Sequence, residues 1–307
     1  MRFGVLAMVR SVVVAATLSA APAFADSVAQ SPIIPAASQS RLLSIGGDVT
    51  EILDALGYSD RIVAVDSTSK YPESALKTKA NVGYMRALAT EGVLSVNPTA
   101  IIASLGAGPS DVVKALKASS IPYVEVPDDP TAAGVSKKIR VIGAALAQSS
   151  RADALAASVE AEFEILAKES KILTAKKRAI VILSVQNGRA IIGGANSSAD
   201  AMLALAGADN AAVGLNGFQP VSDEQLAEFA PDAVIVMRRT GEGSTKTLEA
   251  VASLTGLQSS PANRSRSVIE MDGLFLLGFG PRTPAAVRDL RSALYPDTAA
   301  PPARREP

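Results

Sequence analysis

A long run of helix-forming residues without glycine or proline occupies residues 149–173, with the sequence SSRADALAASVEAEFEILAKESKIL. Alanine, leucine, glutamate and lysine have high helix propensity, and an uninterrupted run of them predicts one long helix. Leu155, Val159, Phe163 and Leu166 recur at helical spacing and form a narrow apolar stripe. A single long helix in the middle of the chain predicts a rigid connection between two lobes.

On both sides of this helix, short β-branched segments alternate with helical patterns, which is typical of parallel α/β layers. The sequence therefore predicts an α/β fold with one lobe at residues 41–148, a second at residues 174–295, and the helix between them. The predicted strands are 41–45, 61–66, 100–104, 122–126, 178–185, 233–237 and 267–271, and the predicted lobe helices are 48–56, 90–96, 109–118, 131–147, 198–206, 222–229 and 283–294.

The two predicted lobes repeat one pattern. The segment ATEGVLSVNPTAIIA (89–103) aligns without gaps with SDEQLAEFAPDAVIV (222–236). In each copy a glutamate in the first turn of a short helix, Glu91 or Glu224, is followed by a proline and then by an apolar strand. Upstream of each copy, a Gly-Gly pair precedes a further helix. The sequence therefore predicts two copies of one structural unit.

The first 25 residues have the composition of a signal peptide. Arg2 and Arg10 flank the start, SVVVAATLSA is a short apolar core, and AFA precedes Asp26 as a cleavage sequence of small residues. No cysteine follows the apolar core, so no lipid anchor and no direct membrane insertion are expected. Residues 26–40 and 296–307 are rich in small residues and proline without periodicity, and both are predicted to be disordered. We expect an exported, periplasmic protein.

The composition excludes several classes of function. With 30 basic and 30 acidic residues among 307, the chain lacks the basic surface of a nucleic-acid-binding protein. It has no cysteine, which excludes disulfides and thiolate metal sites, and no histidine, which removes the usual general base and zinc ligand. An enzyme is therefore not expected, and a zinc or manganese carrier would lack imidazole ligands.

A tyrosine and an arginine lie two positions apart in NVGYMRALATEGVLSVNP, residues 81–98. If residues 82–86 are extended, Tyr84 and Arg86 point to the same side, because side chains alternate along a strand. A phenol has a reference pKa of about 10, but a neighbouring guanidinium and a trivalent metal both favour the phenolate. Tyrosinate is a known axial ligand of ferric haem. The pair is a candidate haem-iron site, and a partly exposed tyrosine beside a solvated arginine is the alternative.

Further segments accompany this pair. They are SIGGDVTEI (44–52), VDSTSKYP (65–72), VGYMRAL (82–88), EGVLSVNP (91–98), GGANSSADAMLALAGADNA (193–211), GFQPVSDEQLAEFAPDAVIV (217–236) and LLGFGPRTPAAVRDL (276–290). With them the chain resembles the periplasmic haem-binding proteins of bacterial ABC-type haem importers over roughly residues 41–294. The resemblance implies two Rossmann-like α/β lobes joined by a single long α-helix, with the ligand held in the cleft.

The resemblance also implies roles for individual residues. Tyr84 matches the family's haem-iron ligand, and Arg86 matches the arginine that stabilises that phenolate. Tyr71 is the alternative iron ligand, although a turn-packing role is favoured for it. Glu91 and Glu224 match the glutamates that dock on the membrane permease, one from each lobe, and stabilisation of a helix N-terminus is their purely structural alternative. Ser222 and Gln225 also have the spacing of a capping box.

Two glycine-containing loops, LGAGPS (105–110) and RRTGEGS (238–244), follow predicted strands. Ligands of open α/β sheets bind beyond the carboxyl ends of strands, so both loops are expected at the rim of the cleft. Gly106 and Gly108 would permit close approach to a flat ligand. Arg239, or its neighbour Arg238, is a candidate partner for a haem propionate, and Phe218 lies where relatives often carry an aromatic residue.

We therefore expect a monomeric, periplasmic substrate-binding protein that captures ferric haem through Tyr84 and delivers it to an inner-membrane ABC permease. A carrier of a corrinoid or a ferric siderophore with the same fold is the alternative. Some relatives use a histidine from the second lobe or hold two haems, and the absence of histidine excludes any second site that depends on that residue.

Overall fold

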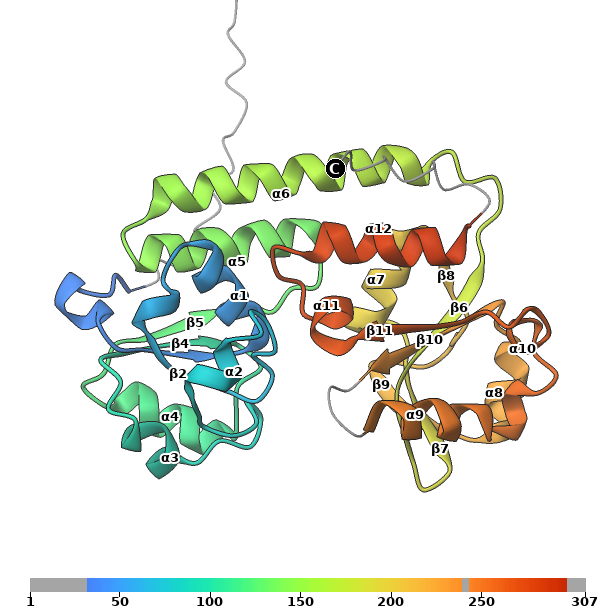
Figure 1. The fold of residues 1–307 in the computed structure, drawn as a ribbon, viewed down its shortest axis with the longest axis horizontal. Helices are drawn as coiled ribbons and strands as arrows, with labels where there is room; N and C mark the ends of the chain where they lie inside the picture. The colour runs from blue at the N-terminus through green and yellow to red at the C-terminus, as the bar shows by residue number, and fades with distance from the viewer. Residues whose placement is uncertain (1–31, 239–242, 297–307) are drawn as a thin grey trace, which may run out of the picture. The chain divides into compact units, whose positions relative to one another are not determined.

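The structure, a computed structural model, describes residues 32–238 and 243–296 and contains two β-sheets, each with helices on both faces (Figure 1). The predicted α/β fold is confirmed. We call the first sheet with its helices the N-terminal lobe and the second sheet with its helices the C-terminal lobe. The predicted signal peptide, residues 1–25, and all but the first residue of the predicted tail, 296–307, lie outside the described residues.

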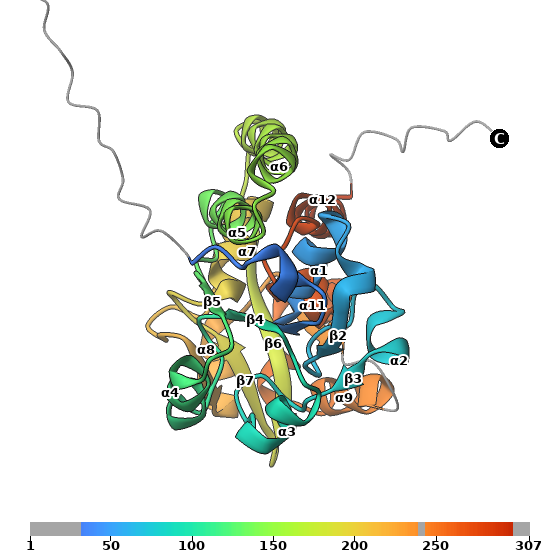
Figure 2. The same ribbon diagram turned by 90° about the vertical axis from the view of Figure 1, so that its left-hand side faces the viewer.

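Five parallel strands form the sheet of the N-terminal lobe. Its elements are β1 (Leu42–Ile45), α1 (Gly47–Ala55), β2 (Ile62–Val65), α2 (Ala75–Thr78), β3 (Ala80–Asn81), α3 (Thr90–Ser95), β4 (Ala100–Ser104), α4 (Ser110–Ala118), β5 (Tyr123–Val126) and α5 (Ala132–Ala145). The strand order is β3-β2-β1-β4-β5. Leu42 and Ile102 pack on α1 and α5, whereas Leu43 and Ile101 pack on α3 and α4, on the opposite face (Figure 2). Burial on both faces explains why the strands are continuously apolar.

The long helix α6 (Ser149–Ser170) connects the lobes. Its 22 residues correspond to about 33 Å, and it ends three residues before the predicted Leu173. Buried along it are Ala152, Ala156, Val159, Phe163 and Leu166. It packs closely on α5, because Gly143 has no side chain where a Cβ would lie 2.1 Å from Ala152 Cβ. Within residues 32–238 and 243–296, no helix has both the length and the hydropathy that crossing a membrane requires.

The C-terminal lobe contains a mixed sheet. Its elements are β6 (Arg178–Gln186), β7 (Arg189–Gly193), α7 (Ser198–Ala206), β8 (Asp209–Asn210), β9 (Phe218–Val221), α8 (Asp223–Phe229), β10 (Ala233–Arg238), α9 (Gly243–Ala252), α10 (Pro261–Ser265), β11 (Val268–Asp272), α11 (Gly273–Leu277) and α12 (Thr283–Leu294). The strand order is β11-β10-β6-β7-β9, and β8 also pairs with β6.

Two antiparallel pairings in this sheet, β6 with β7 and β7 with β9, correct the expectation of parallel layers throughout. The first arises at Asn187 and Gly188, which connect β6 to β7 with φ values of 50° and 73°. A two-residue hairpin turn with both φ angles positive suits Asn-Gly, because these residues tolerate left-handed backbone. The hairpin therefore follows from a local signal that a search for βαβ units overlooks.

The predicted duplication is confirmed in the strand order. In the N-terminal lobe the order β2-β1-β4-β5 is entirely parallel, and in the C-terminal lobe β8-β6-β10-β11 is parallel in the same way. The short helix α3 precedes β4 as α8 precedes β10. The hairpin strand β7 and its partner β9 are thus additions to the repeated unit.

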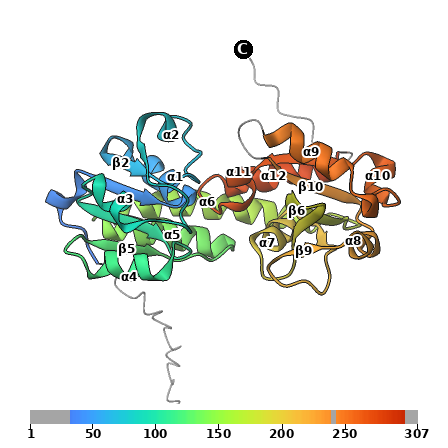
Figure 3. The ribbon, with the colours of Figure 1, turned by 90° about the horizontal axis from the view of Figure 1, so that it is seen from below.

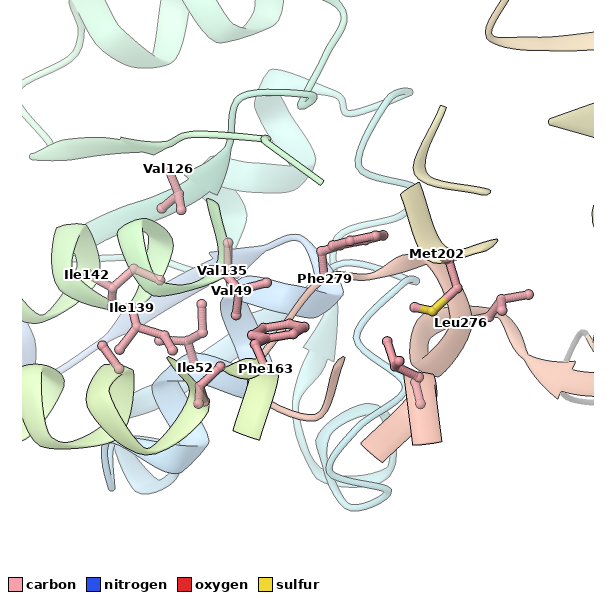
Figure 4. Packing of buried hydrophobic residues seen from close by; sticks show 14 of the residues in the cluster. Val49, Ile52, Val126, Val135, Ile139, Ile142, Phe163, Met202, Leu276 and Phe279 are labelled. Atoms are coloured by element: carbon pink, nitrogen blue, oxygen red, sulfur yellow. The ribbon is translucent and has the colours of Figure 1, made fainter. Parts of the chain in front are cut away.

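One apolar cluster extends through both lobes. It continues from Val49 and Ile139 of the N-terminal lobe, through Phe163 of α6, to Met202 of α7 and Leu276 of α11 (Figure 4). Two smaller clusters fill the other face of each sheet. Because α6 contributes to the shared cluster, the connection between the lobes is part of the core.

The predicted disorder of residues 26–40 is wrong for its second half. Ile34 is buried, and its N–H donates to the carbonyl of Ala145 at 2.7 Å. The side chain of Gln39 donates to the carbonyls of Ile34 and Leu146 at 2.9 and 3.3 Å. A composition of small residues and prolines misled the prediction, because two side chains suffice to attach this segment to the end of α5. Residues 26–31 lie outside the described residues.

Tyr123 of β5 leads to a prediction for stability. Its hydroxyl is buried and has no hydrogen-bond partner among the described residues, and burial raises the pKa of this phenol to about 12. A buried polar group without a partner costs free energy. Tyr123→Phe should therefore raise the free energy of unfolding at pH 7 by about 1 kcal/mol, measured by urea denaturation.

The same substitution should change the pH dependence. The unfolded chain ionises a tyrosine near pH 10, before the folded one, so wild-type stability should fall between pH 10 and 12. The Tyr123→Phe protein should lose less stability over this interval. A stability at pH 7 below that of the wild type would mean that the hydroxyl has a favourable partner.

Candidate functional site

Residues of both lobes line a pocket of about 610 Å³. Small-molecule sites usually have volumes of roughly 300–1,000 Å³. Gly47 follows β1 and Arg238 ends β10, so the pocket lies beyond the carboxyl ends of strands, as expected for open α/β sheets. It brings together three of the predicted site residues, Tyr84, Arg86 and Phe218.

Tyr84 and Arg86 reach the pocket through a turn. The N–H of Ala87 donates to the carbonyl of Tyr84 at 2.8 Å, which places Met85 and Arg86 at the centre of a β-turn. The condition that residues 82–86 are extended is not met beyond Tyr84, but both side chains line one pocket. Tyr84 is 48% exposed, so its side chain is accessible to a ligand.

Backbone hydrogen bonds hold this turn against neighbouring loops. The carbonyl of Gly83 accepts from the N–H of Ser67 at 2.8 Å. The N–H of Gly108 donates to the carbonyl of Met85, and the carbonyl of Gly108 accepts from the N–H of Leu88, both at 2.9 Å. These bonds fix the height of the turn above the sheet.

Gly106 and Gly108 lie behind the turn rather than on the pocket wall that the structure describes. A Cβ on Gly106 would come 3.6 Å from Met85 Cε, and a Cβ on Gly108 would come 3.7 Å from the carbonyl oxygen of Arg86. This position favours a supporting role over the predicted direct contact with a ligand.

Asp66 organises the floor beneath the turn. This fully buried carboxylate accepts hydrogen bonds from the N–H of Gly46 (2.9 Å), from the N–H and hydroxyl of Thr68 (2.9 and 2.7 Å) and from the hydroxyl of Ser69 (3.0 Å). The Thr68 hydroxyl in turn accepts from the N–H of Gly47 at 3.0 Å. One carboxylate thus joins the Gly-Gly turn to the loop after β2.

Three cationic side chains line the pocket: Lys70, Arg86 and Arg238. None of them forms an ion pair with any residue that the structure describes. Arg238 comes from the C-terminal lobe and the other two come from the N-terminal lobe. The pocket therefore presents positive charge from two sides.

The carboxylates of the pocket wall have partners. Lys138, fully buried on α5, lies 2.6 Å from Asp48 and 3.5 Å from Asp128. Burial raises the pKa of Asp48, and the ammonium group of Lys138 opposes this shift. Asp272 accepts the N–H of Phe275 at 3.0 Å and caps α11. With Lys138 included, four cations stand against the three carboxylates Asp48, Asp128 and Asp272, so the charge that a ligand would meet is positive by a small excess.

The C-terminal lobe provides an apolar wall formed by Leu183, Phe218, Leu274 and Leu277. Phe218 is the first residue of β9 and is 37% exposed, so its ring is available to a flat ligand. The predicted propionate partner Arg239 lies outside the described residues, whereas its alternative, Arg238, lines the pocket.

Glu91 and Glu224 lie away from the described pocket wall, exposed in the first turns of α3 and α8. The predicted capping box is present: the Ser222 hydroxyl accepts from the N–H of Gln225 at 3.3 Å, and the Gln225 side chain accepts from the N–H of Ser222 at 3.1 Å. The hydrogen bond with Ser222 lowers the pKa of Glu224. Both carboxylates are free to face another protein.

Tyr71, the alternative iron ligand, lines a neighbouring cavity of about 540 Å³ and is not on the described wall of the main pocket. Its ring stacks on the guanidinium of Arg282, whose Cζ lies 3.7 Å from the ring centroid. This agrees with the packing role favoured for Tyr71.

Arg282 also connects the lobes, in the segment between α11 and α12 that lies against α1 (Figure 3). Its backbone N–H donates to Glu51 Oε1 at 2.8 Å, and its Nε and Nη2 lie 3.0 and 2.9 Å from Glu51 Oε2. Burial raises the pKa of Glu51, and Arg282 opposes this shift. A buried carboxylate of one lobe thus depends on a cation of the other.

Sequence reasoning missed several residues of this region: Asp48, Glu51, Lys70, Met85, Lys138, Met237 and Arg282. A signal existed for Lys138, which lies at helical spacing from buried Gly134 and Ile142 and so had to be buried with an acidic partner. For Arg282 the segment was noted, but the partner is 231 residues away. No group of three or more acidic side chains within the described ranges could hold a bare metal ion.

Comparisons with known proteins identify a matching family and solved structures with a similar fold. Residues 42–273 match the family model described as periplasmic binding protein. The periplasmic heme-binding protein RhuT from Roseiflexus sp. RS-1, solved in apo form, is 35% identical with a TM-score of 0.79, and the match covers 84% of this chain and 98% of that one.

Two sequence relatives complete the comparison. An uncharacterized ABC transporter substrate-binding lipoprotein of Bacillus subtilis (strain 168), YvrC, is 28% identical over 261 residues, 84% of this chain and 81% of that protein. A vitamin B12-binding protein of Yersinia pestis (strain Pestoides F) is 35% identical over 98 residues, only 32% of this chain and 34% of that protein.

The pairing of Glu51 with Arg282 leads to a prediction. Arg282→Ala should lower the free energy of unfolding by about 3 kcal/mol, because it leaves a buried carboxylate without its cation. Arg288→Ala is the matched control, since Arg288 pairs with Glu162 at 3.0 Å and both side chains are 46% exposed. An exposed pair contributes at most about 1 kcal/mol. If both variants lose the same free energy of unfolding in urea denaturation, the interlobe pair stabilises the protein no more than an exposed pair does.

Proposed function

The chain belongs to the periplasmic binding protein family, and from this premise we propose that it captures ferric haem in the pocket beside Tyr84 and delivers it to an inner-membrane ABC permease. In this proposal the protein is a periplasmic monomer that carries out no chemistry on its ligand, in keeping with a family of binding proteins.

The position of Tyr84 carries the proposal. Its accessible phenol lies on the pocket wall next to Arg86, in a chain that has no histidine or cysteine to offer iron. A phenolate is a hard anionic donor of the kind that binds ferric haem, and the guanidinium of Arg86 lines the same pocket. The pocket residues therefore fit ferric iron better than a softer or divalent metal.

The charges on the wall support haem as the ligand. Haem has a flat apolar ring and two carboxylates at one edge. Leu183, Phe218 and Leu274 would contact the ring faces. Arg86 and Arg238, which have no ion-pair partner among the described residues, would bind the propionates. Burial of the ring faces supplies most of the affinity in this arrangement, while the phenolate selects iron.

A corrinoid or a ferric siderophore is the second candidate, favoured by the partial similarity to a vitamin B12-binding protein. A corrinoid carries amides around its ring in place of two carboxylates, so it would leave the three pocket cations without partners. Competition among haem, cobalamin and a ferric siderophore for the purified protein separates these ligands.

Titration with ferric haem tests the proposed iron ligand. The wild-type complex should show a phenolate-to-iron charge-transfer band. Tyr84→Phe should lose this band and bind haem at least about 10-fold more weakly, the lower end of what metal sites lose even for an outer-shell change. Tyr71→Phe is the control and should keep the band, because Tyr71 packs on Arg282 in the neighbouring cavity. A band that survives in Tyr84→Phe would overturn the proposal.

Delivery to the permease is assigned to Glu91 and Glu224. These residues occupy equivalent places in the duplicated unit, since α3 and α8 each lead into a central strand. Two exposed carboxylates in matching positions of the two lobes suit docking onto basic residues of a transporter.

Charge reversal at these positions tests the docking role. Glu91→Lys with Glu224→Lys should abolish growth on haem as the sole iron source in cells that express the cognate permease, while haem affinity in solution stays unchanged. Glu228→Lys, an exposed change on the same helix as Glu224, should leave growth normal. Normal growth of the double variant would show that Glu91 and Glu224 are not required for docking on the permease.

A further inference from the structure

Two methionines line the haem pocket, one from each lobe. Met85 lies in the Tyr84 turn, and Met237 is next to last in β10. In a chain without histidine and cysteine, a thioether is the softest group available to haem iron. The proposed function does not use either sulfur.

The two sulfur atoms lie in different surroundings. Met85 Sδ is 4.0 Å from the hydroxyl of Thr68, so it faces the loop of its own lobe. Met237 Sδ occupies a notch at Gly273, where a Cβ would lie only 2.9 Å from the sulfur. Gly273 itself lines the pocket, so this notch holds the Met237 thioether at the pocket wall.

Among the described pocket residues of the C-terminal lobe, those other than Met237 are unsuitable as iron ligands. The pocket residues of the C-terminal lobe are Leu183, Ser198, Phe218, Met237, Arg238, Asp272, Gly273, Leu274, Leu277 and Gly278. Arginine has no lone pair to donate, Asp272 is engaged in capping α11, and a serine hydroxyl is a poor ligand when protonated. Met237 remains as the donor that the C-terminal lobe offers to the pocket that Tyr84 also lines.

We propose that Met237 is the axial ligand of ferrous haem in this pocket, whereas Tyr84 is the ligand of ferric haem. The proposal rests on the proposed function. A hard phenolate prefers the ferric ion, and a soft thioether prefers the ferrous ion and raises the reduction potential of haem. When dithionite supplies one electron to the bound iron, the Tyr84 phenolate would leave the iron and take a proton from water, and the Met237 sulfur would bind in its place.

The experiment compares wild type, Met237→Leu and Met85→Leu, each loaded with ferric haem and then reduced with dithionite. Leucine has a similar volume, so folding should be preserved. X-ray absorption of the reduced wild-type complex should show a sulfur neighbour of iron, and Met237→Leu should lose it. The midpoint potential should shift to a more negative value in Met237→Leu, and the sulfur neighbour of iron should persist in Met85→Leu.

A second variant tests the notch. Gly273→Ala keeps Met237 but places a methyl group where its sulfur lies, so it should also lose the iron–sulfur signal. Ferric spectra of all variants should keep the Tyr84-dependent band. If the band is present and Met237→Leu matches the wild type after reduction, the inference fails and the haem function stands. If the wild-type protein lacks the band, the haem function itself fails.

Discussion

Glu51 lies buried in α1, and its carboxylate is neutralised from the other lobe by Arg282. A buried charge in this position is tolerated only while its partner stays in place. If the two lobes moved apart, the Glu51 carboxylate would be exposed to solvent or left buried without Arg282. The shared apolar cluster through α6 imposes the same condition. The pocket next to this pair therefore has walls at a nearly fixed separation, and ligand exchange must rely on local changes or on a docked partner.

Within that frame the polar groups of the pocket divide into two kinds. Asp48, Asp128 and Asp272 have partners within the protein. Lys70, Arg86 and Arg238 have no acidic partner among the described residues and remain available. A pocket whose acidic side chains have partners and whose cations do not favours an anionic ligand. The apolar wall of the C-terminal lobe favours a flat one. The cations without an acidic partner among the described residues therefore determine which ligands this pocket binds.

The sequence predicted the elements that depend on local pattern. The alternation of strands and helices, the helix at 149–170 and the capping box at Ser222 all follow from spacing along the chain. Tyr84 and Arg86 were found because they are neighbours in sequence. Arg282 was not, because it acts on a group in the other lobe, and periodicity carries no information on which distant segments meet. The Asn187-Gly188 hairpin was the exception, a local signal that the expectation of parallel layers obscured.

The partners in the Glu51–Arg282 pair are separated by 231 positions, and Arg282 precedes the final helix of the described chain. During synthesis the N-terminal lobe leaves the ribosome with this carboxylate unpaired, because Arg282 has not yet been made. Contacts between such distant residues form late and slowly. A chain of this design therefore completes the contact between its lobes only after almost all of it has been made.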